Sequence, residues 1–91
     1  MKYFAALSPM KDEEKSKQYR EQHLEFIKEK REEGSVLMFG RFTDGVGGLV
    51  IYKGESKEAV EALVSQDPYF MHDARHLELH EWDMQTDYTI S

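Results

Sequence analysis

Hydrophobic and polar residues alternate along the chain in two different periods, and the short apolar runs predict strands. Runs of strand length cover residues 2–7, 36–42 and 49–53, and a last one starts at Leu77 and ends near Trp82. Ser-Pro or Asp-Gly sequences follow the first two runs, and such sequences are typical of turns. The run 36–42 is almost continuously apolar, so we expect it to be a strand that is buried on both faces.

Two segments between these runs have apolar residues at helical spacing. The first helix is expected to start after Asp12, which can accept hydrogen bonds from the helix N-terminus, and to end at Gly34. The second should start after Ser56 and stop before Pro68. The stripe of the first helix consists of Tyr19, His23, Phe26 and Ile27. The stripe of the second consists of Ala59, Val60, Leu63 and Val64.

The resulting order is βαββαβ, which is typical of the ferredoxin-like α+β fold. This fold has a four-stranded antiparallel sheet with two helices on one face, and 91 residues form a single domain, 1–91. We expect its core at about residues 2–83 and a polar C-terminal tail at 84–91. The other face of so apolar a sheet needs a cover, because it would otherwise be a large wet hydrophobic patch. A second copy is the usual cover in this architecture, so we predict a homodimer, the dimeric α+β barrel.

Charge and composition narrow the possible partners. The net charge is −6 and the basic residues are interleaved with acidic ones, which argues against a nucleic-acid partner. The chain has no cysteine, so thiolate catalysis, disulfides and cysteine-based metal sites are excluded. The N-terminal apolar run is too short for a signal peptide or a membrane span. We therefore expect no membrane association and, by default, a cytoplasmic protein.

The candidate chemistry lies in His23 and Asp67. An imidazole titrates near neutral pH and a carboxylate can fix its tautomer, so the pair can transfer protons if the fold brings it together. Each residue also has a structural alternative: His23 can be a core residue, and Asp67 can cap a short helical turn that starts at Pro68. Arg20, one turn before His23, could bind an anionic group or could pair with Glu13 or Glu25.

Other polar groups do not predict a metal or phosphate site. The histidines near the C-terminus are two i,i+4 pairs with a nearby aspartate: His72, Asp73, His76 and His80. In a strand, the i,i+4 spacing separates two residues by ~13 Å, so we expect no metal here. The glycines of the 44–48 turn join two strands, and no Lys-Ser/Thr follows them as it does in a P-loop.

Several residues in a fixed order carry a family resemblance. They are Arg20-x-x-His23-Leu24, Gly34, Gly40, Ser56 and Asp67-Pro68-Tyr69. From Tyr3 to Trp82 the chain resembles the YCII-related (YciI-like) family of small dimeric α+β barrel proteins. The resemblance implies that His23 and Asp67 are an active-site dyad. One departure is Arg41, which stands where many relatives have proline and which would add positive charge to the pocket.

The sequence thus predicts a small acid–base enzyme that needs no cofactor. His23 and Asp67 would catalyse the elimination, isomerisation or hydrolysis of a small cyclic or aromatic molecule, with an anionic ligand as one option. The expected substrate-binding residues are Arg20, Arg41, Met38, Tyr69 and Phe70. Two alternatives stay open: a non-catalytic small-molecule binding or sensing module, and an oxygenase-like or haem-handling α+β barrel protein.

Overall fold

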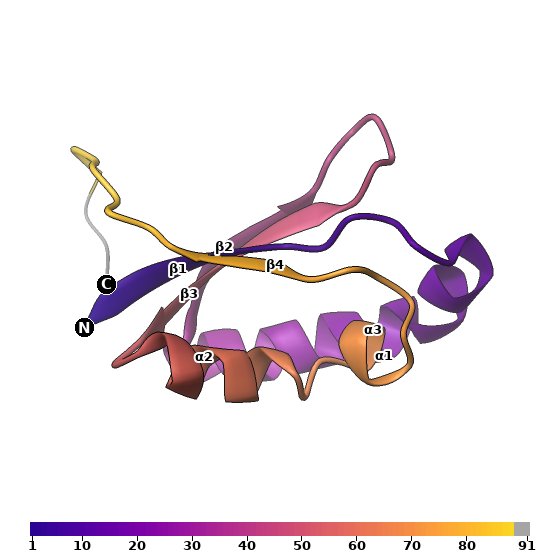
Figure 1. The fold of residues 1–91 in the computed structure, drawn as a ribbon, viewed down its shortest axis with the longest axis horizontal. Helices are drawn as coiled ribbons and strands as arrows, with labels where there is room; N and C mark the ends of the chain where they lie inside the picture. The colour runs from indigo at the N-terminus through magenta and orange to yellow at the C-terminus, as the bar shows by residue number, and fades with distance from the viewer. Residues whose placement is uncertain (89–91) are drawn as a thin grey trace.

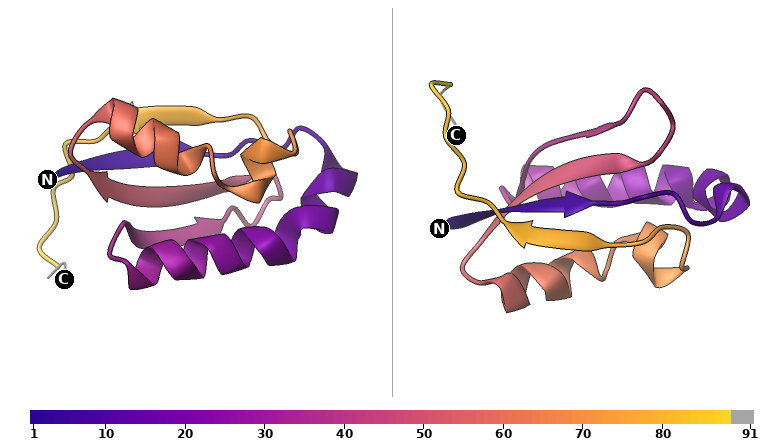
Figure 2. Two further views of the ribbon diagram at one scale, coloured as in Figure 1. Left: turned by 90° about the horizontal axis from the view of Figure 1, so that it is seen from below. Right: turned by 45° about the horizontal axis from the view of Figure 1, so that its top comes forward.

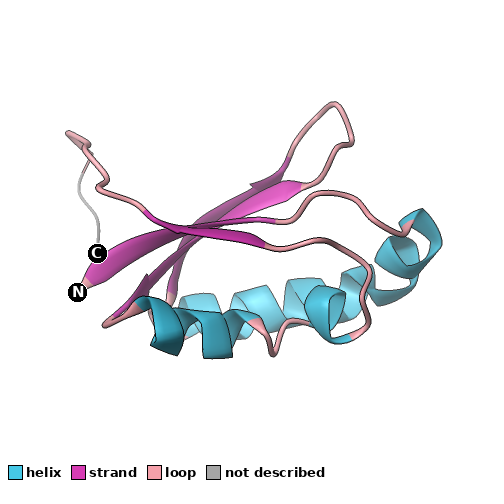
Figure 3. Ribbon diagram, in the orientation of Figure 1, coloured by secondary structure: helices cyan, strands magenta, loops and turns pink. Residues whose placement is uncertain are grey.

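The structure, a computed structural model, describes residues 1–88. Its elements follow the predicted order, with one additional short helix before the last strand (Figures 1 and 3). They are β1 Lys2–Leu7, α1 Glu13–Glu32, β2 Val36–Arg41, β3 Gly48–Gly54, α2 Lys57–Val64, α3 Pro68–Met71 and β4 Glu78–Glu81. The tail expected from residue 84 has no helix or strand up to residue 88, and its last three residues lie outside the described range.

The strands form one antiparallel sheet with the order β2-β3-β1-β4. All the helices lie on the same side of this sheet, as two views show (Figures 1 and 2). Helix α1 packs over β2, whereas α2 contacts β1, β3 and β4. The predicted ferredoxin-like α+β fold is therefore confirmed.

The starts of α1 and α2 and the end of α1 lie where the sequence signals place them, whereas α2 ends at Val64 and Pro68 instead begins α3. Asp12 accepts a hydrogen bond from the backbone N–H of Lys15 at 3.0 Å, and Ser56 accepts one from Ala59 at 3.2 Å. Gly34 follows the last turn of α1 with a φ of +87°, a left-handed conformation that favours glycine. Within residues 1–88, no helix combines the length and the apolar character needed to cross a bilayer.

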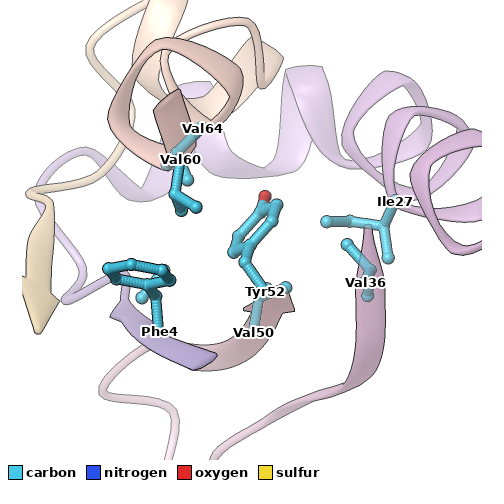
Figure 4. Packing of buried hydrophobic residues seen from close by; sticks show 8 residues of the cluster. Phe4, Ile27, Val36, Val50, Tyr52, Val60 and Val64 are labelled. Carbon is cyan, nitrogen blue, oxygen red and sulfur yellow. The ribbon is translucent and has the colours of Figure 1, made fainter. Parts of the chain in front are cut away.

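The core lies between the sheet and the helices (Figure 4). Its buried apolar residues are Phe4, Ala6, Ile27, Val36, Val50, Tyr52, Val60 and Val64. Tyr52 is central to it: its ring points from β3 into the space between α1 and α2, and the residue has no exposed surface. Within residues 1–88, the Tyr52 hydroxyl has no hydrogen-bond partner. A buried donor without a partner is unfavourable, so this core contains one polar group that costs stability.

Strand β2 differs from its prediction, because it is not buried on both faces. Val36 is 2% exposed, but Met38 is 51% and Phe39 39% exposed. A β-bulge between Val36 and Met38 is one reason: Val36 pairs with Tyr52 but Met38 pairs with Ile51. The bulge turns Met38 to the sheet face opposite the helices. The other reason is that β2 is an edge strand, so one side has no neighbour.

The sheet face opposite the helices is apolar over its centre. Its residues, by strand alternation and register, include Tyr3, Ala5, Leu7, Met38, Leu49 and Ile51. Trp82, 42% exposed, donates its backbone N–H to Tyr3 and continues the alternation of Glu78 and His80. It therefore belongs to this open face.

Replacing Tyr52 by phenylalanine is expected to keep or raise the free energy of unfolding at pH 7, by up to about 1 kcal/mol, because the unpaired hydroxyl is removed. Burial, with the negative charge of Asp67, raises the pKa of Tyr52. Unfolded tyrosine titrates at pH ~10, whereas the buried phenol keeps its proton to a higher pH. The free energy of unfolding of the wild type therefore does not depend on this group below pH ~10 and falls as the pH rises above that value. Urea unfolding at pH 8 and pH 11 should show the advantage of the variant growing with pH.

Tyr88→Phe is the matched control, because Tyr88 is 87% exposed. It should not change the pH dependence of unfolding. A Tyr52→Phe protein that loses stability with pH as steeply as the wild type would contradict the prediction.

Candidate active site

The two side chains expected to act together are in direct contact. His23 lies on α1 and Asp67 lies just before α3, and the His23 Nδ1 atom is 2.8 Å from each Asp67 carboxylate oxygen. The Asp67 side chain is 1% exposed and the His23 side chain 12% exposed. The contact is therefore shielded from water, and such contacts are stronger than those at the surface.

Both roles considered for Asp67 are present at once. Asp67 is the N-cap of α3, where its Oδ1 atom accepts a hydrogen bond from the Tyr69 backbone N–H at 3.0 Å. This second bond fixes the carboxylate relative to the backbone, so its orientation does not depend on His23. An ionised carboxylate can only accept hydrogen bonds, so Nδ1 of His23 is the donor. Nε2 of His23 is then the ring nitrogen left for proton exchange, and it has no partner within residues 1–88.

Two cationic or aromatic groups pack on the ring of Tyr69. The His23 ring stacks on it with a centroid separation of 4.0 Å and an interplanar angle of 12°. The Cζ atom of Arg75 lies 4.4 Å from the centroid of the same ring. Two planar groups at these distances cannot share one face of a phenol without overlapping, so the ring of Tyr69 lies between them. The imidazole is thus held by a hydrogen bond on one side and a stacking contact on another.

The electrostatics of Tyr69 favour its protonated form. Burial raises the pKa of Tyr69, and the negative charge of Asp67 acts in the same direction. Arg75 and Arg20 oppose that effect with their positive charges. The net direction is upward, so the phenol keeps its proton at neutral pH and presents an O–H group.

A cavity of about 380 Å³ opens beside this cluster, between α1 and the β2–β3 hairpin. That volume suits a small molecule. His23 and Tyr69 line it together with residues from the hairpin and the first turns of α1. Gly47 lines it with a φ of +149°, and a side chain there would collide with the backbone oxygen of Ser8.

The cavity is positively charged although the protein is negative. Its lining contains four cationic residues and one acidic residue: Lys17, Arg20, Arg41, Arg75 and Glu13. Arg20 and Arg41 are exposed, and within residues 1–88 neither has a carboxylate within 4.0 Å. The surface pairing of Arg20 with Glu13 or Glu25, which the sequence allowed, is therefore not present.

Two of the residues expected to form the pocket wall lie elsewhere. Met38 is on the opposite face of the sheet because of the bulge in β2. Phe70 packs against the core cluster. Neither is among the residues that line this cavity, whereas Tyr69 is.

The remaining histidines are dispersed. The ring of His72 stacks on Tyr19 at a centroid separation of 3.8 Å, and His80 contacts Glu78 at 3.2 Å. His76 precedes β4. Within residues 1–88, no three histidine, aspartate or glutamate side chains gather as a metal site requires.

Family comparison agrees with this architecture. The sequence model of the YCII-related domain matches residues 1–83, which include every strand and helix described above. The chain belongs to the YCII-related family. No curated protein sequence matches this YCII-related chain.

A solved structure shares the fold of this YCII-related domain. It is a 5-chloro-2-hydroxyhydroquinone dehydrochlorinase (TftG) from Burkholderia phenoliruptrix AC1100, in complex with 2,5-dihydroxybenzoquinone. The TM-score is 0.77 at 15% sequence identity, and the match covers 91% of this chain and 95% of that one. At this identity the similarity establishes the fold of the YCII-related domain and not its substrate.

Sequence reasoning missed one residue at the site of this YCII-related domain, Arg75. It follows Ala74 in a segment without a recognisable motif, and its partners Ser8 and Ser16 are distant in sequence. The only available signal was its type: an arginine close to the end of a predicted helical turn, between two histidine-containing stretches. That signal does not distinguish a cavity residue from a surface residue.

Proposed function

We propose that this YCII-related protein is a small acid–base enzyme in which His23 moves a proton and Asp67 orients it. The observation that carries the proposal is the 2.8 Å contact between His23 Nδ1 and the buried Asp67 carboxylate, at the wall of a cavity of ligand size. A histidine held in one tautomer by a carboxylate is the usual arrangement of a general base near neutral pH. The other ring nitrogen, Nε2, is the atom that would accept the substrate proton.

The reaction class that we propose is elimination, isomerisation or hydrolysis of a small cyclic or aromatic molecule. In an elimination, Nε2 of His23 takes a proton from the substrate while the leaving group departs with its electron pair. The protonated imidazole is stabilised by Asp67 and later releases the proton, so no electrons are exchanged with the protein. The structural neighbour, a dehydrochlorinase, supports this class because loss of hydrogen chloride is such an elimination.

The charges of the cavity support a ligand with an anionic group. Arg20 and Arg41 face the cavity from α1 and β2, and their positive charges are not neutralised by carboxylates within residues 1–88. Tyr69 contributes an aromatic wall next to His23. A flat ring with one ionised oxygen would satisfy both the aromatic and the cationic lining.

The function is tested with purified protein and a panel of small substrates that can lose a leaving group, starting with 5-chloro-2-hydroxyhydroquinone. Chloride release and the change in ultraviolet absorbance report turnover. We expect a rate well above the uncatalysed one for at least one member of the panel. Saturable binding of panel members without turnover would instead support the non-catalytic binding module.

We also propose that the open sheet face joins two copies of the chain. That face is apolar, and all the helices lie on the other side (Figure 1). A chain of 10.7 kDa has a small core, and burying this face would add to its stability. Analytical ultracentrifugation at micromolar concentration should give about twice the monomer mass.

Met38→Lys places a charge on this face and is expected to shift the equilibrium toward monomer, because burying an unpaired ammonium is unfavourable. Met71→Lys is the matched control, since Met71 is on α3 and is 64% exposed. A folded wild-type protein that sediments as a monomer throughout the micromolar range would exclude this assembly.

A further inference from the structure

Arg75 is held more firmly than any other arginine at the cavity. Its Nε atom donates to Ser16 Oγ at 2.9 Å, and its Nη1 atom donates to Ser8, at 3.1 Å to the backbone oxygen and 3.4 Å to Oγ. Its guanidinium also lies over the ring of Tyr69. These contacts come from α1, from α3 and from Ser8, the residue that follows β1, so three segments of the chain fix one planar cation.

In the part of the chain that the structure describes, this cation forms no ion pair. Within residues 1–88, no carboxylate lies within 4.0 Å of Arg75, and its second terminal nitrogen, Nη2, has no hydrogen-bond partner. Ser8 and Ser16 are neutral, so they orient the guanidinium of Arg75 without neutralising its charge. Nearby, Lys11 and Asp73 show the usual alternative, an exposed ion pair at 2.6 Å. A half-buried cation without a counter-ion is unfavourable on its own, which indicates that a ligand supplies the charge.

We propose that Arg75 is the anion anchor of the active site and that the substrate carries an anionic oxygen, a carboxylate or an ionised enol or phenol, which binds Nη2. This proposal rests on the proposed function and specifies its substrate class. The ring of Tyr69 separates Arg75 from His23, so the anionic group binds one aromatic layer away from the imidazole. Arg75 and His23 both line the cavity, so a substrate that is anchored at Arg75 would share the cavity with the imidazole.

Arg75 fits this role better than Arg20 or Arg41 because of preorganisation. Arg20 and Arg41 are exposed and have no hydrogen bonds to hold their side chains within residues 1–88, so a ligand would have to order them. Arg75 has already lost that freedom, and less of the binding free energy is spent on ordering it. Its half-buried position also weakens screening by water and salt.

The test compares benzoate with its neutral counterpart benzamide, using NMR titration to measure both dissociation constants. The wild type should bind benzoate at least tenfold more tightly than benzamide. Arg75→Gln should weaken benzoate binding at least tenfold and leave benzamide binding within twofold, which also shows that the cavity is intact. Arg31→Gln removes the same charge outside the cavity and should change neither constant.

Two results would overturn the proposal: a wild type with no preference for benzoate, or an Arg75→Gln protein that keeps the preference. If Arg75→Gln does not fold, Arg75→Lys decides, because it retains the charge but lacks the planar fork. Its benzoate preference should fall at least threefold, and an undiminished preference overturns the proposal. These are equilibrium measurements, so turnover without benzoate preference contradicts only the role of Arg75. Benzoate preference without turnover contradicts only the proposed function.

Discussion

Replacing His23 by asparagine is expected to lower kcat by about 100- to 10,000-fold, the usual contribution of a general base. Asparagine is the informative replacement because its side-chain N–H group lies close to the position of Nδ1 in histidine. It can still donate to Asp67, which would otherwise be a buried carboxylate with fewer partners. The nitrogen that faces the substrate, Nε2, is lost. Activity should therefore fall steeply while the free energy of unfolding changes by only about 1–2 kcal/mol.

His76→Asn is the matched control, since His76 is exposed and does not line the cavity. It should have wild-type kcat and wild-type stability. Steady-state kinetics and urea unfolding of both variants measure the two effects separately. If His23→Asn retains kcat within threefold of the wild type, His23 is not the base, and a binding role for it is the better interpretation.

The fold was predictable because its signals are local. Asp12, Gly34 and Ser56 mark helix ends through hydrogen bonds or backbone angles that involve only their close neighbours. The meeting of His23 with Asp67 followed from the same local signals. The helical spacing of apolar residues places His23 on the stripe of α1 that faces the sheet and α3. The Asp-Pro sequence places Asp67 at the start of α3. Two correctly placed elements were enough to bring these residues together.

The pocket wall was harder to predict because it depends on strand register. Strand alternation from Val36 would put Met38 on the helix side, since side chains two residues apart share a face. The bulge between them reverses this, and no Gly or Pro in that stretch signals it. Phe70 lies in a helix of only four residues, so its position next to Tyr69 did not determine which of the two faces the cavity.

The position of Arg75 could not be predicted from the sequence for a different reason. Its environment consists of Ser8, Ser16 and Tyr69, and the two serines lie more than fifty residues earlier in the chain. Each contact is ordinary, and none has a sequence spacing that could be recognised in advance. The cationic character of the cavity is likewise a property of tertiary structure, because the charges along the chain are interleaved and the total is −6.

Replacing Asp67 by asparagine is expected to reverse the tautomer of His23. In the wild type, Asp67 accepts from both the Tyr69 N–H and His23 Nδ1. In the variant, the amide oxygen stays with the Tyr69 N–H, because that backbone donor would otherwise be buried without a partner. The amide NH₂ group then faces Nδ1, which must accept, so the proton of the neutral ring moves to Nε2. With Nε2 protonated the base is lost, and kcat should fall about 100- to 10,000-fold.

Long-range ¹H–¹⁵N NMR distinguishes the two tautomers directly and needs no substrate. The matched control is Asp44→Asn, because Asp44 also accepts from a backbone N–H two residues ahead, that of Val46, at 3.1 Å, but is exposed and has no histidine partner. It should leave the His23 tautomer and kcat unchanged. A wild-type His23 that carries its proton on Nε2 would show that Asp67 does not set the tautomer. An unchanged tautomer in Asp67→Asn would show the same, because the electrostatic and hydrogen-bonding difference between the two side chains would then have no effect on the ring.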